Sequence, residues 1–134
     1  MTCKSALYTA NVSSATIAAG GTIPFGGVIR RFGRNIDLNG TDISLRGNGY
    51  YLVNITASLT ASAAGDATVT LLKDGVAIVG AFATATATEA GTVNMSISAL
   101  VRETGCQGSS QLSLQLTGIA VTALNVATVI EKVA

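Results

Sequence analysis

Apolar and polar residues alternate along three long segments of the chain, GYYLVNITASLTA, GTVNMSISALVR and QLSLQLTG. A two-residue period of this kind is typical of strands that bury one face and expose the other. No segment of comparable length has the spacing of a helix. The pattern predicts that the apolar sides of these strands meet in one core, and these sides are Tyr51, Val53, Ile55, Ala57 and Leu59; Val93, Met95, Ile97, Ala99 and Val101; and Leu112, Leu114 and Leu116.

Turn-forming residues separate further segments of strand length. Asn39-Gly40 and Asp74-Gly75 each lie between two such segments, which predicts a tight hairpin at each position. Many short strands with no helix between them favour an all-β sandwich or barrel. The strands that we predict are Ala6–Ala10, Thr16–Ile23, Val28–Phe32, Asn35–Leu38, Asp42–Arg46, Tyr50–Ala61, Ala67–Lys73, Ala77–Thr86, Thr92–Arg102, Gln111–Thr117 and Thr122–Lys132.

The last of these strands, TALNVATVIE, is apolar on both faces. Strict alternation divides its apolar residues into two sets, which are Leu124, Val126 and Ile130, and Ala123, Ala127 and Val129. A strand that is apolar on both sides either lies under a second layer or faces another subunit. The small side chains of the second set would allow close approach around a symmetry axis.

Charged residues make up 11% of this 134-residue chain, which is less than half of the roughly 25% typical of soluble proteins. We expect residues 1–134 to form a single domain, with residues 1–15 as an N-terminal strand or arm. A domain so poor in charge tends to expose an apolar patch, and oligomerisation usually covers such a patch. The alternative is that exposed Ser and Thr side chains supply all the polarity that is needed.

Composition also disfavours several classes of function. The chain has no His, so the common catalytic triads and dyads lack their base, and the acidic residues are scattered. We therefore expect no catalytic site, no cofactor and no metal site. The net charge of +1 and the aromatic fraction of 4% do not favour nucleic acid as a partner. We expect synthesis in the cytoplasm without a signal peptide or a membrane anchor.

The densest group of charges lies in VIRRFGRNID. Guanidinium groups bind anionic groups, and aromatic rings stack on sugars, so this region and the ring before it form a candidate ligand-binding loop. The candidate residues are Phe25, Arg30, Arg31, Phe32 and Arg34. The structural alternative is that the arginines pair with Asp37 or Glu103.

The order of elements resembles a known family. The resemblance extends over Ile36–Lys132 and depends on the Gly49-Tyr50-Tyr51 opening of a long alternating strand, the Lys73-Asp74-Gly75 hairpin and the spacing of the strands. The family is the trimeric jelly roll shared by tumour necrosis factor and the complement globular head, in its small bacterial or phage branch. The head of the collagen-like spore-surface glycoprotein BclA is similar in kind.

The resemblance implies a two-sheet antiparallel jelly-roll sandwich of about ten strands that forms a homotrimer. Its first and last strands and Tyr50–Ala61 would lie near the threefold axis. The expected trimer-interface residues are then Tyr51, Ala123, Ala127 and Val129. The resemblance also places the chain's start and the loop after Arg102 at one end, so Cys3 and Cys106 are candidates for a disulfide, with free thiols as the alternative.

These expectations favour a non-catalytic, homotrimeric surface module. It would serve as a decoration, head fibre or knob on a phage virion, or as a spore-surface component, and its final location would be the virion or the spore or cell surface. A phage is the first choice because the chain lacks the Gly-X-Y repeats of a collagen stalk. The alternative is a carbohydrate-binding, host-recognition module, in which the partner is a glycan or a surface protein.

Overall fold

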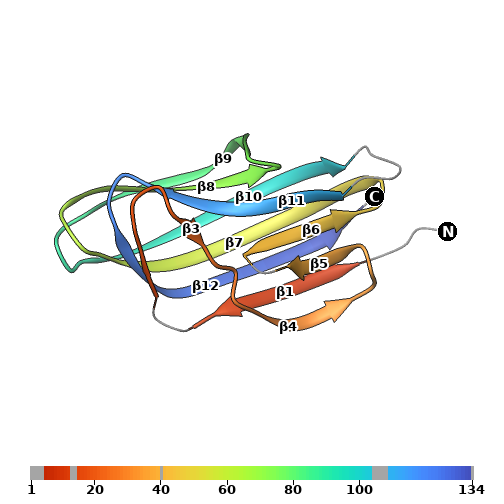
Figure 1. Ribbon diagram of the computed structural model, residues 1–134, viewed down its shortest axis with the longest axis horizontal. Helices are drawn as coiled ribbons and strands as arrows, with labels where there is room; N and C mark the ends of the chain where they lie inside the picture. The colour runs from red at the N-terminus through yellow and green to blue at the C-terminus, as the bar shows by residue number, and fades with distance from the viewer. Residues whose placement is uncertain (1–4, 13–14, 40, 104–108, 134) are drawn as a thin grey trace.

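A computed structural model describes residues 5–12, 15–39, 41–103 and 109–133. These residues form twelve antiparallel strands and no helix, as the alternation predicts (Figure 1). The strands are β1 (Ala6–Asn11), β2 (Ala15–Ile17), β3 (Thr22–Ile23), β4 (Gly27–Phe32), β5 (Ile36–Asn39), β6 (Asp42–Arg46), β7 (Gly49–Ala61), β8 (Gly65–Lys73), β9 (Val76–Ala87), β10 (Thr92–Glu103), β11 (Ser109–Thr117) and β12 (Val121–Lys132).

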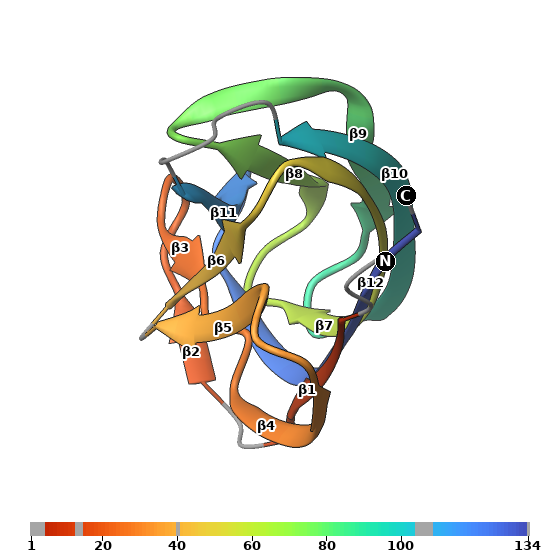
Figure 2. The ribbon, with the colours of Figure 1, turned by 90° about the vertical axis from the view of Figure 1, so that its right-hand side faces the viewer.

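The strands form two six-stranded sheets packed as a jelly-roll sandwich. Sheet A has the order β10-β7-β12-β1-β4, with β2 paired to β12. Sheet B has the order β5-β6-β11-β8-β9, with β3 paired to β11. Figure 2 shows the two layers from one end, with β1 and β4 on one side of the molecule and β9 and β10 on the other.

The core lies between the sheets and is filled by the side chains that the alternation selects. On β7, Tyr51, Val53, Ile55, Ala57 and Leu59 are all buried. The three leucines of β11 and most of the apolar side of β10 pack against them. Because side chains alternate in direction along a strand, the other side of β7 faces outward, and it carries Asn, Thr and Ser after Tyr50 and Leu52 near the start of the strand. The predicted core of these three strands is confirmed.

Both predicted hairpins are present. Val76 pairs with Lys73 across the turn at Asp74 and Gly75, whose φ angles of 51° and 82° are the two positive values that a type I′ turn requires. Asn39 pairs with Asp42, which joins β5 and β6. Gly40 itself lies outside the described residues.

The predicted strand Thr16–Ile23 is wrong as a single element. The structure divides it into β2 in sheet A and β3 in sheet B, with a turn at Gly20 and Gly21 between them. Gly20 has a φ of +85°, and a Cβ atom on Gly21 would lie 2.9 Å from the carbonyl oxygen of Ala18. The two glycines therefore let the chain turn sharply enough to cross from one sheet to the other.

A β-bulge in β12 changes which residues face the core. The pairing with β7 shifts between Ala123 and Asn125, so Leu124 is an extra residue on the β12 side. Ala123 consequently faces the core together with Val126 and Ile130, while Leu124 is exposed. The division of this strand into two apolar faces by strict alternation is wrong at these two positions.

Candidate functional site

The described residues contain no group of three or more His, Cys, Asp or Glu side chains that could hold a metal ion. Within the same part of the chain, no helix has the length and apolarity to span a bilayer. The candidate functional features are instead exposed apolar surfaces and an uneven distribution of charge.

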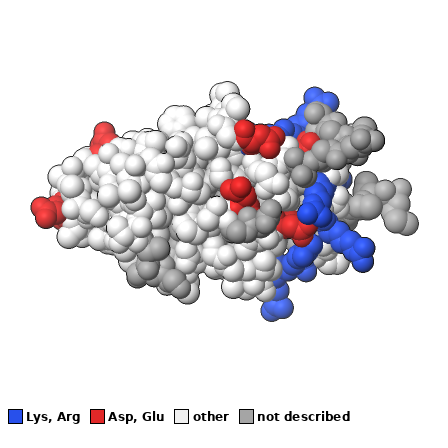
Figure 3. Space-filling view, in the orientation of Figure 1, with Lys and Arg blue, Asp and Glu red and all other residues white. Residues whose placement is uncertain are grey.

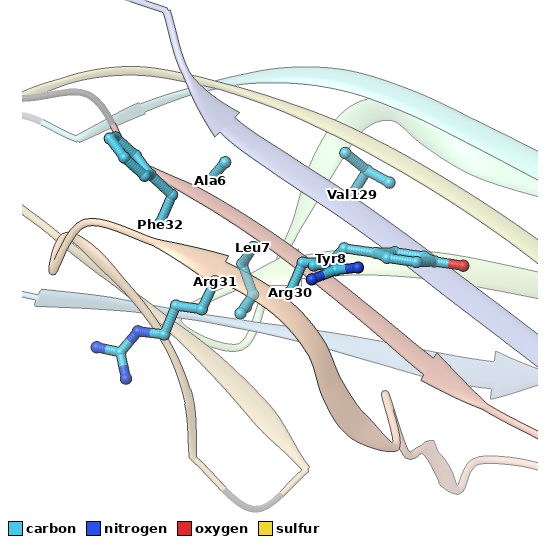
Figure 4. Close-up of a pocket in the computed structure, with 7 residues that line it drawn as sticks. All are labelled: Ala6, Leu7, Tyr8, Arg30, Arg31, Phe32 and Val129. Carbon is cyan, nitrogen blue, oxygen red and sulfur yellow. The ribbon is translucent and has the colours of Figure 1, made fainter.

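An open pocket of about 230 Å³ lies on the outer face of sheet A, where β1, β4 and β12 run side by side (Figure 4). Tyr8 is directly opposite Val129 on β12 and Arg30 on β4. Ala6 is directly opposite Phe32. The lining is almost entirely apolar and consists of Ala6, Leu7, Tyr8, Arg30, Arg31, Phe32 and Val129.

The rim of this pocket is unusually exposed for apolar side chains. Tyr8 is 37%, Val129 42% and Phe32 66% exposed. Every residue of the edge strand β4 is exposed. We call Ala6, Tyr8, Phe32 and Val129 the pocket face. Exposed apolar surface concentrated in this way marks an interaction site.

A second apolar surface lies on β9, the edge strand of sheet B. Val79 is 100% exposed, and Val76 and Phe82 are also exposed. The pairing of β8 with β9 shifts between Thr70 and Leu72, so residues 78–81 lie opposite a single residue of β8 and form a bulge, in which Val79 is exposed and Ala81 is buried. Gly80 supports the bulge with a φ of +81°. We call Val76, Val79 and Phe82 the β9 knob.

Charged side chains gather at the end of the sandwich where β1 begins and β12 ends (Figure 3). Asp37 on β5 forms ion pairs with Arg31 on β4 and with Arg46 on β6, which links the edges of the two sheets. Arg102 lies over the Tyr50 ring, with its guanidinium carbon 5.8 Å from the ring centre. The structural alternative for Arg31, pairing with Asp37, is confirmed.

A polar cluster closes the core at the same end. The Tyr51 hydroxyl oxygen lies 2.6 Å from the carbonyl oxygen of Arg46 and 2.8 Å from that of Gly47. Burial raises the pKa of Tyr51, the Glu103 carboxylate raises it further, and a hydrogen bond with Asn35 acts in the opposite direction. The neutral phenol is therefore the form that this site holds.

Several predicted site residues lie in the core rather than on a surface. Tyr51 and Phe25 are 0% exposed and Ala123 is 1% exposed. Their side chains cannot touch a neighbouring subunit or a sugar because the second sheet and the loops cover them. The assignments of Tyr51 and Ala123 to a trimer interface and of Phe25 to a ligand loop are therefore wrong.

The other predicted residues are distributed as follows. Val129 is exposed in the pocket face, and Ala127 lies half-buried two residues before it on the same strand. The pocket includes Arg30, Arg31 and Phe32, whereas Arg34 is exposed in the turn that follows β4. Cys3 and Cys106, the candidates for a disulfide, lie outside the described residues.

Sequence reasoning missed Tyr8 and Val79. Tyr8 lies in a short strand whose partners the sequence does not give, so its place beside Val129 was not evident. The signal for Val79 was Gly80, which interrupts an apolar run. A glycine inside a strand pattern often marks a bulge, and a bulge reverses the direction of the neighbouring side chains.

No protein-family model matches this chain, and no curated protein matches it. Solved structures do match over nearly the whole length. The vertex protein P5 of PRD1 is 14% identical, with 100% of both chains covered and a TM-score of 0.68. Eiger TNF from S. frugiperda is 8% identical, with 98% of this chain and 92% of that chain covered and a TM-score of 0.69.

The globular domain of zebrafish complement 1qA protein is also similar. It is 8% identical, with 94% of this chain and 93% of that chain covered and a TM-score of 0.67. At such low identity these similarities concern the fold alone. They confirm the jelly roll of the tumour necrosis factor and complement type that the sequence resembles.

Proposed function

We propose that this chain is the subunit of a non-catalytic homotrimer that forms a decoration, fibre head or knob on a phage virion. A spore-surface component is the alternative location. The full-length similarity of fold to a phage vertex protein supports the virion. The absence of His from the sequence supports a role in assembly rather than catalysis.

The observation that carries this proposal is the presence of two separate apolar surfaces, the pocket face and the β9 knob. They lie on different sheets and on opposite sides of the molecule (Figure 2). A two-fold contact brings the same surface of two copies together and would leave the other surface exposed. A head-to-tail contact, with the knob of one copy on the pocket face of the next, covers both.

Head-to-tail contacts either close into a ring or continue as a filament. A ring of subunits around an axis parallel to the strands closes only if the two surfaces lie at the same height, that is, at the same position along that axis. The pocket face includes Ala6, the first residue of β1, and the β9 knob begins at Val76, the first residue of β9. Both strands begin toward the end where the charged residues gather, so the heights are compatible with a ring. In the family that the sequence resembles, the ring closes with three subunits.

The mass of the protein in solution tests the proposal. Light scattering is expected to give three times the subunit mass of 13.4 kDa. Val129→Asp places a charge in the pocket face, and we expect it to give a folded monomer because burying an unpaired carboxylate in the contact is costly. Val12→Asp is the matched control, since Val12 is exposed outside both apolar surfaces. A wild-type protein that is monomeric at micromolar concentration would refute the trimer.

Carbohydrate binding is the second candidate function, and the pocket favours it. Two aromatic side chains, Tyr8 and Phe32, flank the pocket, and Arg30 is beside them (Figure 4). Rings of this kind stack on sugars, and a guanidinium group binds acidic ones. Glycan-array binding by the intact trimer that Phe32→Ala abolishes would favour this function. In the proposed trimer the next subunit covers the pocket face, so the trimer proposal predicts that no glycan binds there.

A further inference from the structure

Every described Lys and Arg lies toward one end of the sandwich. Figure 3 shows the basic side chains gathered there, while most of the remaining surface in that view is uncharged. Contacts between strands also place three of these side chains at the same end. Lys73 donates a hydrogen bond to the carbonyl oxygen of Arg102, which lies opposite Tyr50 on β7, and Lys132 lies opposite Tyr51, the next residue of β7. We call this region the basic end, and its described cations are Arg30, Arg31, Arg34, Arg46, Lys73, Arg102 and Lys132.

Three acidic residues of this end are engaged or buried within the subunit, whereas Glu131, next to Lys132, is exposed. Asp37 binds Arg31 and Arg46. The Asp74 carboxylate accepts a hydrogen bond from the backbone N–H of Gln111 over 2.9 Å. Glu103 is buried. The opposite end, by contrast, carries Asp66 at the start of β8 and Glu89 in the turn before β10. The molecule is therefore electrically polarised along its strands.

Two arginines of the basic end lie outside the pocket that the proposed trimer covers. Arg34 is exposed, and within the described part of the chain it has no ion pair. Arg102 is exposed over the Tyr50 ring. A guanidinium group is weakly hydrated and binds a carboxylate through two parallel hydrogen bonds. The basic end is thus suited to carboxylates.

Apolar side chains lie among these arginines. Tyr50 and Val133 are exposed toward the same end and lie outside the two surfaces that the proposed trimer covers. Arginine mixed with aromatic and aliphatic side chains, with few lysines, is the composition of protein–protein interfaces. A surface for a hydrated polyanion such as nucleic acid needs dense cationic charge and gains little from exposed aliphatic groups.

We propose that the basic end is the docking surface of this module and that its partner is an acidic protein surface with apolar side chains among its carboxylates. The inference deepens the proposed function, since it assigns the end by which the module attaches. In a trimer whose axis runs along the strands, three basic ends face the same way. Three weak contacts then act together, which raises the overall affinity without any new contact.

The test measures binding of the intact protein to three immobilised probes: a random copolymer of Glu and Tyr, poly-L-glutamate, and alginate. We expect tightest binding to the copolymer, weaker binding to poly-L-glutamate, and a loss of both as salt rises. Arg34→Gln with Arg102→Gln should weaken copolymer binding about tenfold. Val133→Ser should lower affinity for the copolymer more than for poly-L-glutamate.

The control is Thr16→Asp with Thr92→Asp, which changes the net charge equally at exposed positions remote from the basic end. Its affinity for the copolymer should stay near that of the wild type. The docking proposal would be overturned by any of three results. These are equal binding of alginate and the copolymer, an equal loss of copolymer affinity in the control and in the arginine variant, and no binding to either polypeptide. Light scattering on each sample separates the two proposals. A trimer that binds nothing refutes only the docking surface, and a monomer that binds the copolymer refutes only the trimer.

Discussion

The hydroxyl oxygen of Tyr51 lies 2.6 Å from the carbonyl oxygen of Arg46, beneath the turn that joins β6 to β7. The Tyr51 ring is fully buried, so the hydroxyl is the polar tip of a core side chain. It ties the beginning of β7 in sheet A to the end of β6 in sheet B. The sandwich is therefore closed at this end by a hydrogen bond rather than by apolar packing alone.

Removal of this hydroxyl should destabilise the subunit. Tyr51→Phe keeps the ring in the core but loses the contacts with Arg46 and Gly47, and we expect the free energy of unfolding to fall by about 1–2 kcal/mol. Asn35 still donates to the Arg46 carbonyl oxygen, which limits the loss. Urea unfolding measures the change, and Tyr8→Phe is the control because Tyr8 is exposed. Equal effects of the two variants would contradict this role of Tyr51.

The raised pKa of Tyr51 predicts a loss of stability at alkaline pH. A group that holds its proton more tightly in the folded state than in the unfolded state contributes stability that is fully present below its unfolded pKa. That contribution is lost as the pH rises through the folded pKa. The free energy of unfolding should therefore decline above about pH 10, and the decline should be smaller in Tyr51→Phe. Parallel pH profiles of the two proteins would show that Tyr51 is not responsible.

Gly118 and Gly80 should respond differently to substitution by alanine. Both have a positive φ, of +98° and +81° respectively, so each variant incurs backbone strain of about 1–3 kcal/mol. A Cβ atom on Gly118 would also collide with the carbonyl oxygen of Asp66, whereas one on Gly80 meets nothing within 4 Å. Gly118→Ala should therefore lower the free energy of unfolding by more. The reverse order in urea unfolding would contradict the packing at Gly118.

Val79→Asp should prevent assembly without affecting the subunit. Because Val79 is 100% exposed, the substitution should change the free energy of unfolding of one subunit by less than about 0.5 kcal/mol. In the proposed trimer the carboxylate would be pressed against the apolar pocket face of the next copy. Light scattering should give the monomer mass, with an unchanged circular dichroism spectrum. Persistence of the trimer would exclude the β9 knob from the contact.

The alternation in the sequence identifies the core of β7, β10 and β11 because these strands are regular throughout. It fails at Ala123 and gives no face for Val79 for a common reason. Ala123 lies next to a bulge and Val79 within one, and where one strand holds more residues than its partner the period that assigns a face is interrupted. The number of extra residues depends on the partner strand, and a single segment does not reveal it.

The candidate site was only partly predictable. Val129, Arg30 and Phe32 stand out in the sequence by their type, but their grouping into one pocket depends on the order β4-β1-β12 in sheet A. Phe25 lies outside the alternating segments, so the pattern does not indicate which way its ring points. In the structure the ring is fully buried in the core, and Phe25 belongs to the segment that connects β3 to β4.

The first and last strands of the sandwich run antiparallel side by side, and the N–H of Lys132 donates to the carbonyl oxygen of Ser5 over 2.9 Å. A short peptide could therefore join the two ends into a circle, and the chain could be reopened at the turn between β9 and β10 with every strand still in its place. A foreign sequence grafted into that turn would be displayed away from the ends. The end of the sandwich that holds the two termini can thus be used for attachment, and the end that holds the β9–β10 turn can display an inserted sequence.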